Sequence, residues 1–252
     1  MKNWIDNFLN SKLPQIVNDR QYEKNTVNSP NPFARLSHRN RVKKCVTFIV
    51  PRLELGKVLD YGCGTGLFVS ILNSIKPGIA IGYEPYITEK FERDAKIFSS
   101  FDDILSLKPF FTITLFEVIE HLSNSSLEEF LTRSTGLLGG GGIYVSAPIE
   151  IGPVIIVKEL YRILNRKNSP YGHTFEYTFF EFVKAAFFGI AGKRPGDGSH
   201  GYGPHKGFDF RKTIKFIESK GWKVTVLGYG PLPIIGWYGN SQVFFKMEST
   251  KK

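Results

Sequence analysis

The chain has 252 residues, 42% of them hydrophobic, which suits one α/β domain with additions and a substantial core. The N-terminus lacks a basic region followed by an apolar run, and no apolar stretch is long enough to span a bilayer, so neither a signal peptide nor a membrane span is expected. The two cysteines, Cys45 and Cys63, are too few for a disulfide framework and favour a reducing compartment, so we expect a cytoplasmic protein.

The net charge of +10 is distributed unevenly along the chain. Residues 1–56 carry +6, residues 57–150 carry −5 and residues 151–252 carry +9. Basic flanks around an acidic middle are compatible with an anionic substrate or surface, and equally with a solvated surface that aids solubility.

Two helices are expected before the first strand. Apolar residues recur at helical spacing within residues 1–18, and residues 34–49 combine apolar positions with a run of basic side chains. Residues 19–33 are polar, contain two prolines and indicate a linker. Residues 1–55 are therefore interpreted as an N-terminal helical cap. The inward-facing positions of the second helix are expected to be Leu36, Val42, Val46 and Ile49.

The chain is organised around Lys57–Phe68. This stretch predicts a short buried strand, a turn with three glycines at alternate positions and a helix starting near Leu67. Glycines let the backbone turn sharply and approach a ligand, and the amides of the turn and the helix start can face it. Asp60 ends the strand, where open α/β sheets bind ligands. A phosphate loop is excluded because no Lys-Ser/Thr pair follows the last glycine, and the glycine spacing differs from the dinucleotide fingerprint.

The string from Val58 to Gly66 resembles motif I of the class I S-adenosylmethionine (SAM) methyltransferases. In that family the loop wraps the methionine part of SAM, and the acidic residue helps to hold the ammonium group. The resemblance, to the quinone and small-molecule methyltransferase type with unassigned substrate, implies SAM as cofactor and S-adenosylhomocysteine (SAH) as product. The loop residues implied to contact SAM are Asp60, Tyr61, Gly62, Cys63, Gly64 and Gly66.

Strands and helices then alternate, as in a parallel sheet. A second strand, residues 79–84, ends in Glu84, which the resemblance implies binds the ribose hydroxyls, with Pro85 bordering the adenine. A helix is expected at residues 90–95 and a third strand at Ile97–Phe98. Adenine contacts are implied next, with Phe101 and Asp102 as candidates. Asp102 or Asp103 could instead cap the following short helix.

A second specific stretch, Phe111–Leu122, resembles the strand-four motif of the same family, although Phe111 stands where the family usually has Asp. We expect a strand at residues 113–116, and the resemblance places Phe116 and Glu117 beside the methionine portion of SAM. An amphipathic helix at residues 127–138, a glycine stop at residues 139–142 and a fifth strand at residues 143–148 complete this part of the family plan.

Residues 149–204 are interpreted as an insertion on the substrate side. A loop and helix are expected up to residue 165, then an aromatic-rich helix at residues 178–188, and the many glycines of residues 189–207 indicate a lid rather than packed structure. The aromatic helix could cover the substrate pocket, belong to the core or contact a membrane surface. The stretches 147–152 and 205–209 are similar to those of a group of bacterial methyltransferases of unassigned substrate.

A helix at residues 211–220 and strands at residues 222–227 and 242–247 close the sequence. The expected fold is therefore α/β: a Rossmann-like class I methyltransferase fold with a seven-stranded, mostly parallel sheet whose last strand is antiparallel. The methyltransferase domain would span residues 56–252, with the N-terminal helices and the insertion after strand five as additions.

Methyl transfer from a sulfonium needs mainly alignment of the reacting atoms, but a hydroxyl or amine acceptor can require a general base. His121 is the candidate base, and Glu120, His173 and His205 are further candidates. A Glu-His pair after strand four could equally serve only to fix a loop.

A metal-dependent alternative uses the same residues. Glu117, Glu120 and His121 share one turn and suit Mg²⁺ or Mn²⁺, and His173 could add a fourth ligand. This set resembles the metal-dependent small-RNA 2′-O-methyltransferases, and basic flanks would fit RNA phosphates. The E-V-x-E-H pattern is also widespread in methyltransferases that need no metal, so no metal is expected.

The function predicted from the sequence is SAM-dependent methyl transfer to a small-molecule, saccharide or lipid-type acceptor. The alternatives are the metal-dependent RNA 2′-O-methyltransferase, for which nucleic acid would be the partner, and a non-catalytic SAM-binding protein. A peripheral contact with a membrane surface is a further predicted interaction.

Overall fold

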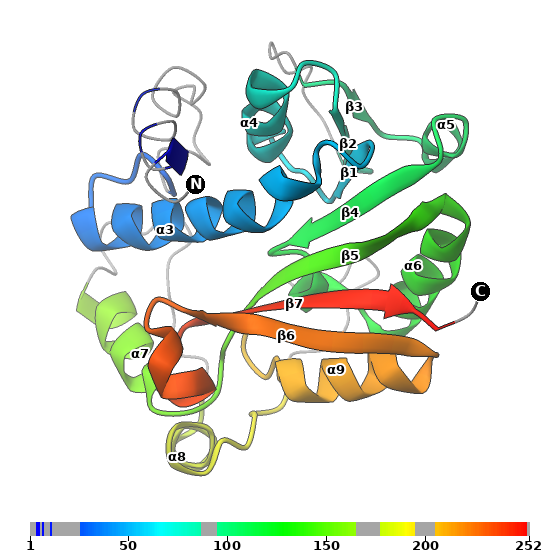
Figure 1. The fold of residues 1–252 in the computed structure, drawn as a ribbon. Coiled ribbons are helices and arrows are strands. Elements are labelled where there is room, and N and C mark those ends of the chain that lie inside the picture. The colour runs from blue at the N-terminus through cyan, green and yellow to red at the C-terminus, as the bar shows by residue number, and fades with distance from the viewer. Residues whose placement is uncertain are drawn as a thin grey trace. The chain divides into compact units, whose positions relative to one another are not determined.

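The computed structural model describes most of the chain (Figure 1). The described residues are Trp4, Ile5, Asn7, Ser11, 26–86, 95–164, 177–194 and 205–250. The chain separates into two compact units, each of which is described by itself. One comprises Met1–Phe116, Thr132–Val145 and Met247–Ser249, and the other comprises Glu117–Leu131, Ser146–Lys246 and Thr250–Lys252.

The strands form one seven-stranded sheet in the order β3-β2-β1-β4-β5-β7-β6, mostly parallel with the last strand antiparallel. The predicted fold class is thereby confirmed. The strands are β1 Val58–Tyr61, β2 Ala80–Tyr83, β3 Ile97–Phe98, β4 Phe110–Phe116, β5 Leu138–Pro148, β6 Trp222–Gly230 and β7 Gln242–Ser249. The described helices are α3 Pro32–Ile49, η1 Val50–Arg52, α4 Leu67–Ile75, α5 Phe101–Leu105, η2 Ile119–His121, α6 Asn124–Leu137, α7 Val154–Leu164, α8 Phe179–Phe188, α9 Phe210–Ser219 and η4 Pro233–Gly239.

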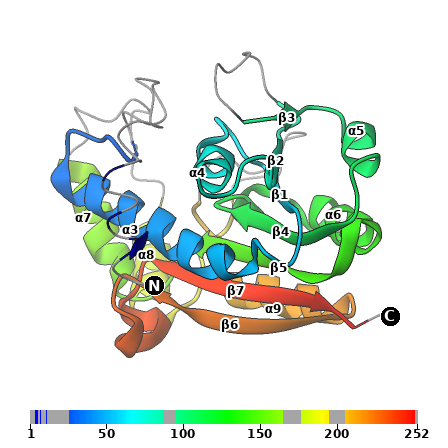
Figure 2. The ribbon, with the colours of Figure 1, turned by 45° about the horizontal axis from the view of Figure 1, so that its top comes forward.

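In the first unit, β1 pairs in parallel with both β2 and β4, and Asp60 lies opposite Gly82 and Thr114. Val58 and Leu59 are fully buried, as expected for a strand with neighbours on both sides. Helix α4 packs against β2, and both views place it beside β1 and β2 (Figures 1 and 2). These contacts fix the end of β1 and the start of α4, and thereby both ends of the turn that joins them.

Helix α3 contains the residues of the second predicted helix, 34–49, and packs against α4. Val46 and Ile71 belong to one buried cluster with Ile5. Leu36, however, was expected to face inward and is 59% exposed, so that part of the prediction is wrong. Most of the predicted first helix, and the helix predicted at residues 90–95, lie outside the described residues.

The glycine run at residues 139–142 is part of β5 and does not form the predicted stop after a helix. The reason is close packing. A Cβ at Gly141 would collide with the carbonyl oxygen of Phe111, and one at Gly139 would lie 2.8 Å from Cβ of Pro109. These glycines therefore let β5 approach neighbouring backbone, a known use of glycine within a strand.

In the second unit, α9 packs along β6, as both views show (Figures 1 and 2). Helix α8 begins with a capping box between Thr178 and Glu181 and ends at Gly189, whose φ of 62° lies in the left-handed region. Its inner side packs on α7 through Ala185 and Ile155, but most of its aromatic rings are exposed, so the helix is not a core element. Among the described helices, none is both long and apolar enough to cross a membrane.

Part of the predicted glycine-rich lid lies outside the described residues. Where it is described, glycine serves close packing: a Cβ at Gly207 would lie 2.6 Å from the carbonyl oxygen of Gly192 and 2.7 Å from the amide nitrogen of Arg194. At this position the expectation of unpacked structure is wrong.

Candidate functional site

The turn between β1 and α4 is built from three glycines in the left-handed region. Gly62, Gly64 and Gly66 have φ of 72°, 51° and 75°. A Cβ at Gly66 would lie 2.7 Å from Cδ1 of Ile97, whereas one at Gly64 would meet nothing within 4 Å. The loop is therefore packed at its helix end and open at Gly64, where a ligand can approach the backbone.

Glu84, directly after β2, holds this loop. Its Oε2 accepts a hydrogen bond of 3.0 Å from the Gly64 amide, and its Oε1 accepts one of 3.3 Å from the Tyr86 amide. Each carboxylate oxygen can accept a further bond, because it has two lone pairs. Pro85 and Tyr86 are exposed beside it.

Asp60 is buried at the end of β1, and its Oδ1 accepts a hydrogen bond of 2.6 Å from Thr114. Burial raises the pKa of Asp60 to about 7; the Thr114 hydroxyl opposes this shift and the charge of Glu84 adds to it. Burial, with the charges of Asp60 and Glu84, also raises the pKa of the Cys63 thiol. The charge of Glu84 close to the Asp60 carboxyl gives a site that favours a cationic ligand.

Aromatic side chains border the same loop. The Phe101 ring, at the start of α5, contacts the Tyr83 ring edge-on at 5.8 Å and lies 4.7 Å from the Arg133 guanidinium. Phe116 contacts Phe68 edge-on at 4.9 Å.

Neither Asp102 nor Asp103 is the N-cap residue of α5. The N-cap of α5 is Ser100, without a side-chain cap bond, and Asp102 and Asp103 lie in the first turn. The capping alternative for these two residues is therefore wrong. Carboxylates in a first turn are instead favoured by the helix dipole.

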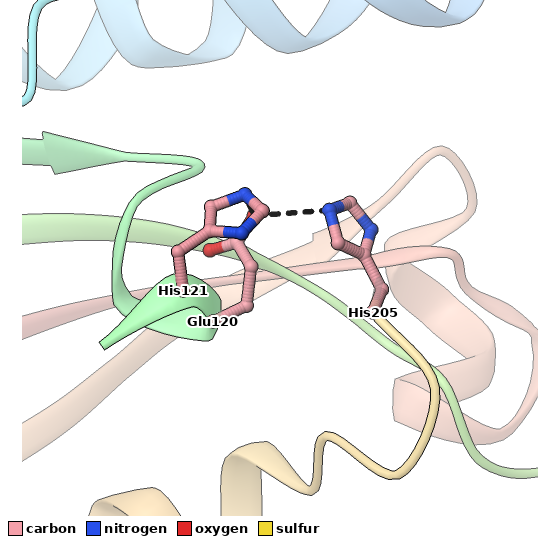
Figure 3. Close-up of side chains that lie close together, drawn as sticks. All are labelled: Glu120, His121 and His205. Carbon is pink, nitrogen blue, oxygen red and sulfur yellow. Dashed lines mark ion pairs between the residues drawn. The ribbon is translucent and has the colours of Figure 1, made fainter. Parts of the chain in front are cut away.

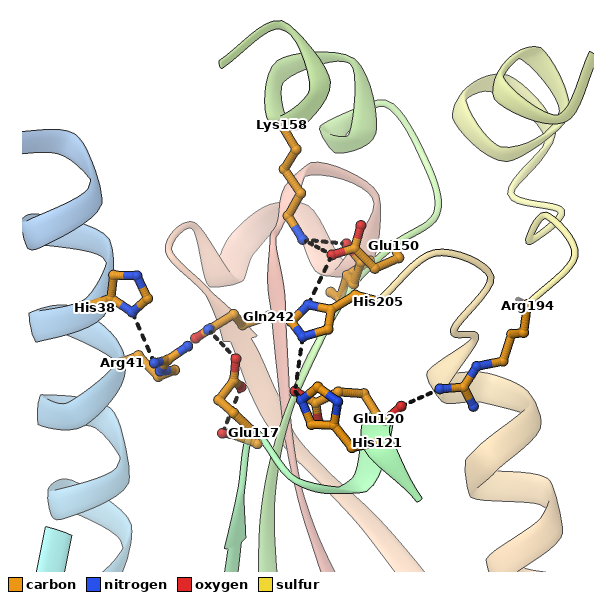
Figure 4. Close-up of polar contacts among 12 residues, drawn as sticks. His38, Arg41, Glu117, Glu120, His121, Glu150, Lys158, Arg194, His205 and Gln242 are labelled. Atoms are coloured by element: carbon orange, nitrogen blue, oxygen red, sulfur yellow. Dashed lines mark hydrogen bonds and ion pairs between the residues drawn. The ribbon is translucent and has the colours of Figure 1, made fainter. Parts of the chain in front are cut away.

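Glu117, in the second unit, is held in an unusual conformation. Its φ of 60° is the only positive value for a non-glycine residue among the described residues. Its amide donates to the carbonyl oxygen of Ser146 at 3.1 Å, and Oε1 accepts from the Ser146 hydroxyl at 3.0 Å. The Gln242 amide donates to Oε2 at 3.4 Å (Figure 4). Strained residues held by their surroundings are frequent at functional sites.

Two histidines meet above one buried carboxylate in the same unit (Figure 3). Glu120 and His121 lie on η2, which follows β4, and His205 precedes α9. Glu120 Oε1 is 3.9 Å from Nε2 of His121 and 3.9 Å from Nε2 of His205, and the imidazole centroids are 5.2 Å apart. These N–O separations are longer than a hydrogen bond.

A second buried carboxylate faces the other nitrogen of His205 (Figure 4). Glu150 Oε1 is 3.8 Å from His205 Nδ1 and 2.8 Å from Lys158 Nζ. Arg194 donates to the backbone carbonyl of Glu120. We call Glu120, His121, Glu150, Lys158 and His205 the histidine cluster.

The sequence prediction named three members of this cluster but missed Glu150 and Lys158. One signal could have found Glu150. The stretches 147–152 and 205–209 are both similar to those of the same group of bacterial methyltransferases, and they contribute Glu150 and His205 to one contact. Of the predicted metal set, Glu120 and His121 come together. Among the described residues they join His205, with ligand atoms within 4.8 Å of one another. His173 lies outside the described residues.

Residues 33–150 match the model of a family described as a methyltransferase domain. With this match, the predicted resemblance to class I SAM-dependent methyltransferases is confirmed. Among curated proteins, none matches the chain.

Solved structures share the fold at low sequence identity. Magnesium protoporphyrin IX methyltransferase from Synechocystis PCC 6803 with bound SAH is 13% identical, with a TM-score of 0.51, covering 99% of this chain and 100% of that one. The plantazolicin methyltransferase BpumL, in complex with a pentazolic desmethylPZN analog and SAH, is 13% identical, with a TM-score of 0.50 and the same coverage, 99% and 100%. At these identities the comparisons establish the fold.

Proposed function

We propose that the protein transfers the methyl group of SAM to a hydroxyl group of a small-molecule, saccharide or lipid-type acceptor. The observation that carries this proposal is the position of His205 between the carboxylates of Glu120 and Glu150, beside His121. SAM, which supplies an electrophilic methyl group, would be held by the loop after β1. The buried Asp60 and the adjacent Glu84 suit the positive charges of its ammonium and sulfonium groups.

The histidine cluster suits a general base for a hydroxyl acceptor. A hydroxyl must lose its proton as it attacks, and an imidazole is the side chain that most often accepts it. The negative charge of Glu120 would stabilise the imidazolium that results, and the ion pair with Lys158 holds the Glu150 carboxylate beside Nδ1 of His205. Either His121 or His205 would accept the proton.

The first experiment is calorimetric titration of the full chain with SAM and SAH. Micromolar binding is expected without added metal. Next, SAH production is measured with panels of phenols, saccharides and lipid-linked saccharides. A preparation that binds SAM but methylates no hydroxyl acceptor while methylating an amine would contradict the proposed acceptor class.

The base is tested with His205→Asn and His121→Asn. The variant that removes the base should lose about 100-fold to 10,000-fold in kcat while SAM affinity is kept. His38→Asn is the matched control, because His38 lies on α3 in the other unit and its Nδ1 forms a hydrogen bond of 2.9 Å with Arg41. Full activity in both cluster variants would show that the cluster has no part in proton transfer.

A metal-dependent methyl transfer, the RNA 2′-O-methyltransferase alternative, is the second candidate. It is favoured by one observation: Glu120, His121 and His205 place three ligand atoms within 4.8 Å. Two imidazoles and a carboxylate suit Mn²⁺ or a similar divalent ion. Unchanged turnover after EDTA treatment would remove this candidate, and loss that Mn²⁺ restores would favour it over the metal-free reaction.

A non-catalytic SAM-binding role is the remaining alternative. It predicts SAM binding without methylation of any acceptor and no cellular consequence of His205→Asn.

Both cysteines are free thiols, which agrees with the proposed action in a reducing cytoplasm.

A further inference from the structure

The second unit carries many large apolar side chains in contact with solvent, on three segments that contact one another. Each is at least 45% exposed, and Ile234 is 100% exposed. Single exposed apolar residues are normal, but a contiguous group indicates an interaction surface. We call this group the apolar surface: Val157, Leu160 and Ile163 on α7; Phe179, Phe180, Phe187, Phe188 and Ile190 on and after α8; Leu232, Ile234, Ile235 and Tyr238 on and before η4.

Direct contacts join the three segments. Helices α7 and α8 pack against each other. The Tyr238 hydroxyl donates a hydrogen bond of 3.0 Å to the backbone carbonyl of Phe187, and the Trp237 ring packs against Gly189, 3.0 Å from where a Cβ would stand. Asn240 fixes η4 by accepting from the Leu232 amide and donating to the Leu232 carbonyl, both at 2.6 Å. The apolar side chains are thus presented by a fixed framework.

The charges on these segments are complementary to an anionic partner. Residues 231–241 contain no charged side chain. Among the side chains described on α7, α8 and the residues up to 194, those that are both charged and exposed are Lys184 and Lys193. The two carboxylates described on α7 and α8 are not exposed to solvent as free charges. Glu159 is buried. Glu181 accepts hydrogen bonds from the Thr178 and Lys193 amides and forms an ion pair of 3.0 Å with Lys206.

We propose that the apolar surface docks the protein on a negatively charged lipid bilayer. Phe180, Lys184 and Phe188 follow helical spacing along one exposed side of α8, the pattern of a helix lying in a membrane interface. A lysine within an apolar stripe can extend its ammonium group to lipid phosphates while its methylenes remain among the aromatic rings. Ile234 and Ile235, on an uncharged turn, would enter the acyl region.

The test is flotation of the full chain with vesicles of phosphatidylcholine alone and with about 30% phosphatidylglycerol. Binding is expected with the anionic vesicles and should weaken, without vanishing, as salt rises. In an Ile234→Trp variant, the fluorescence of the introduced tryptophan should be quenched by lipids brominated on their acyl chains. Neither measurement uses SAM or an acceptor, so its outcome is independent of the proposed methyl transfer.

Phe179→Ser/Phe180→Ser and Ile234→Ser/Ile235→Ser should each weaken vesicle binding at least tenfold while SAM affinity is retained. Leu36→Ser and Leu55→Ser are the matched controls, because both leucines are 59% exposed and belong to the other unit. Lys184→Glu/Lys193→Glu should reduce binding to anionic vesicles selectively. Absence of binding would overturn the proposal. So would the finding that the serine variants abolish dimer formation by the chain instead, which would assign the surface to self-association.

Discussion

The hydroxyl of Thr114 on β4 donates a hydrogen bond of 2.6 Å to Oδ1 of Asp60 on the neighbouring strand β1. This bond stabilises the ionised carboxylate, whereas burial favours the neutral acid and predominates, so the pKa of Asp60 is about 7. Asp60 therefore changes charge near neutral pH in the ligand-free protein.

SAM affinity should consequently rise with pH. Because the ionised form of Asp60 attracts an ammonium group, binding should strengthen roughly fivefold to tenfold between pH 6 and 7.5 as a group with a pKa near 7 ionises. Thr114→Val should move the midpoint of this dependence to higher pH. Calorimetry across the pH range is the measurement, and equal affinity at both ends would contradict the assignment of Asp60 to the cofactor.

Folding stability should respond to pH in the opposite direction. The pKa of Asp60 is raised on folding, from the ordinary 3.8 to about 7, so its contribution to stability is fully present below about pH 4 and is lost as pH rises through 7. Asp60→Asn, which keeps the shape but removes the charge, should therefore raise the Tm at pH 8 and change it little at pH 4. The exposed Asp103→Asn provides the comparison. A Tm gain that does not depend on pH would rule out this linkage.

Glu84 should matter for affinity through its charge. Glu84→Gln removes a carboxylate that would accept from both ribose hydroxyls, and a charge-assisted bond contributes about 1.5–3 kcal/mol. SAM should then bind roughly 10-fold to 150-fold more weakly. Glu54→Gln is the control, since the Glu54 side chain is 83% exposed. Equal SAM affinity in Glu84→Gln and the control would exclude the ribose role.

The glycines around β5 should differ in their tolerance of a methyl group. Gly141→Ala places its Cβ against the Phe111 carbonyl and should destabilise the fold, by about 1–3 kcal/mol as overpacking typically does. Gly136→Ala is the matched change, because Gly136 lies in α6 and its Cβ would meet nothing within 4 Å. It should stabilise by about 0.5–1 kcal/mol. Denaturant unfolding distinguishes the two, and equal effects would contradict the packing argument.

Local signals predicted the first part of the sheet well. The strand at residues 58–60, the helix start at Leu67 and the strand at Ile97–Phe98 each combine apolar residues with a nearby turn, and the structure has all three. The same logic failed at residues 139–142. Four glycines look like a stop along the chain, and only the proximity of Phe111 and Pro109, distant in sequence, explains why glycine is required in a strand.

The histidine cluster shows a similar limit. The resemblance of residues 111–122 to the family's strand-four motif identified Glu120 and His121, which are adjacent in the chain. The contact of His205 with Glu150, and of Glu150 with Lys158, joins residues from three separate segments. No spacing rule relates such segments, because the folding of the whole second unit brings them together.

Glu117 has a consequence for protein engineering. A φ of 60° costs a glutamate free energy that glycine would not lose, so Glu117→Gly relieves backbone strain. A screen for thermostability alone would therefore tend to select against this glutamate, whereas its predicted contact with SAM would be retained only under selection for methyl transfer. At this residue the fold combines a carboxylate held by Ser146 and Gln242 with a strained backbone.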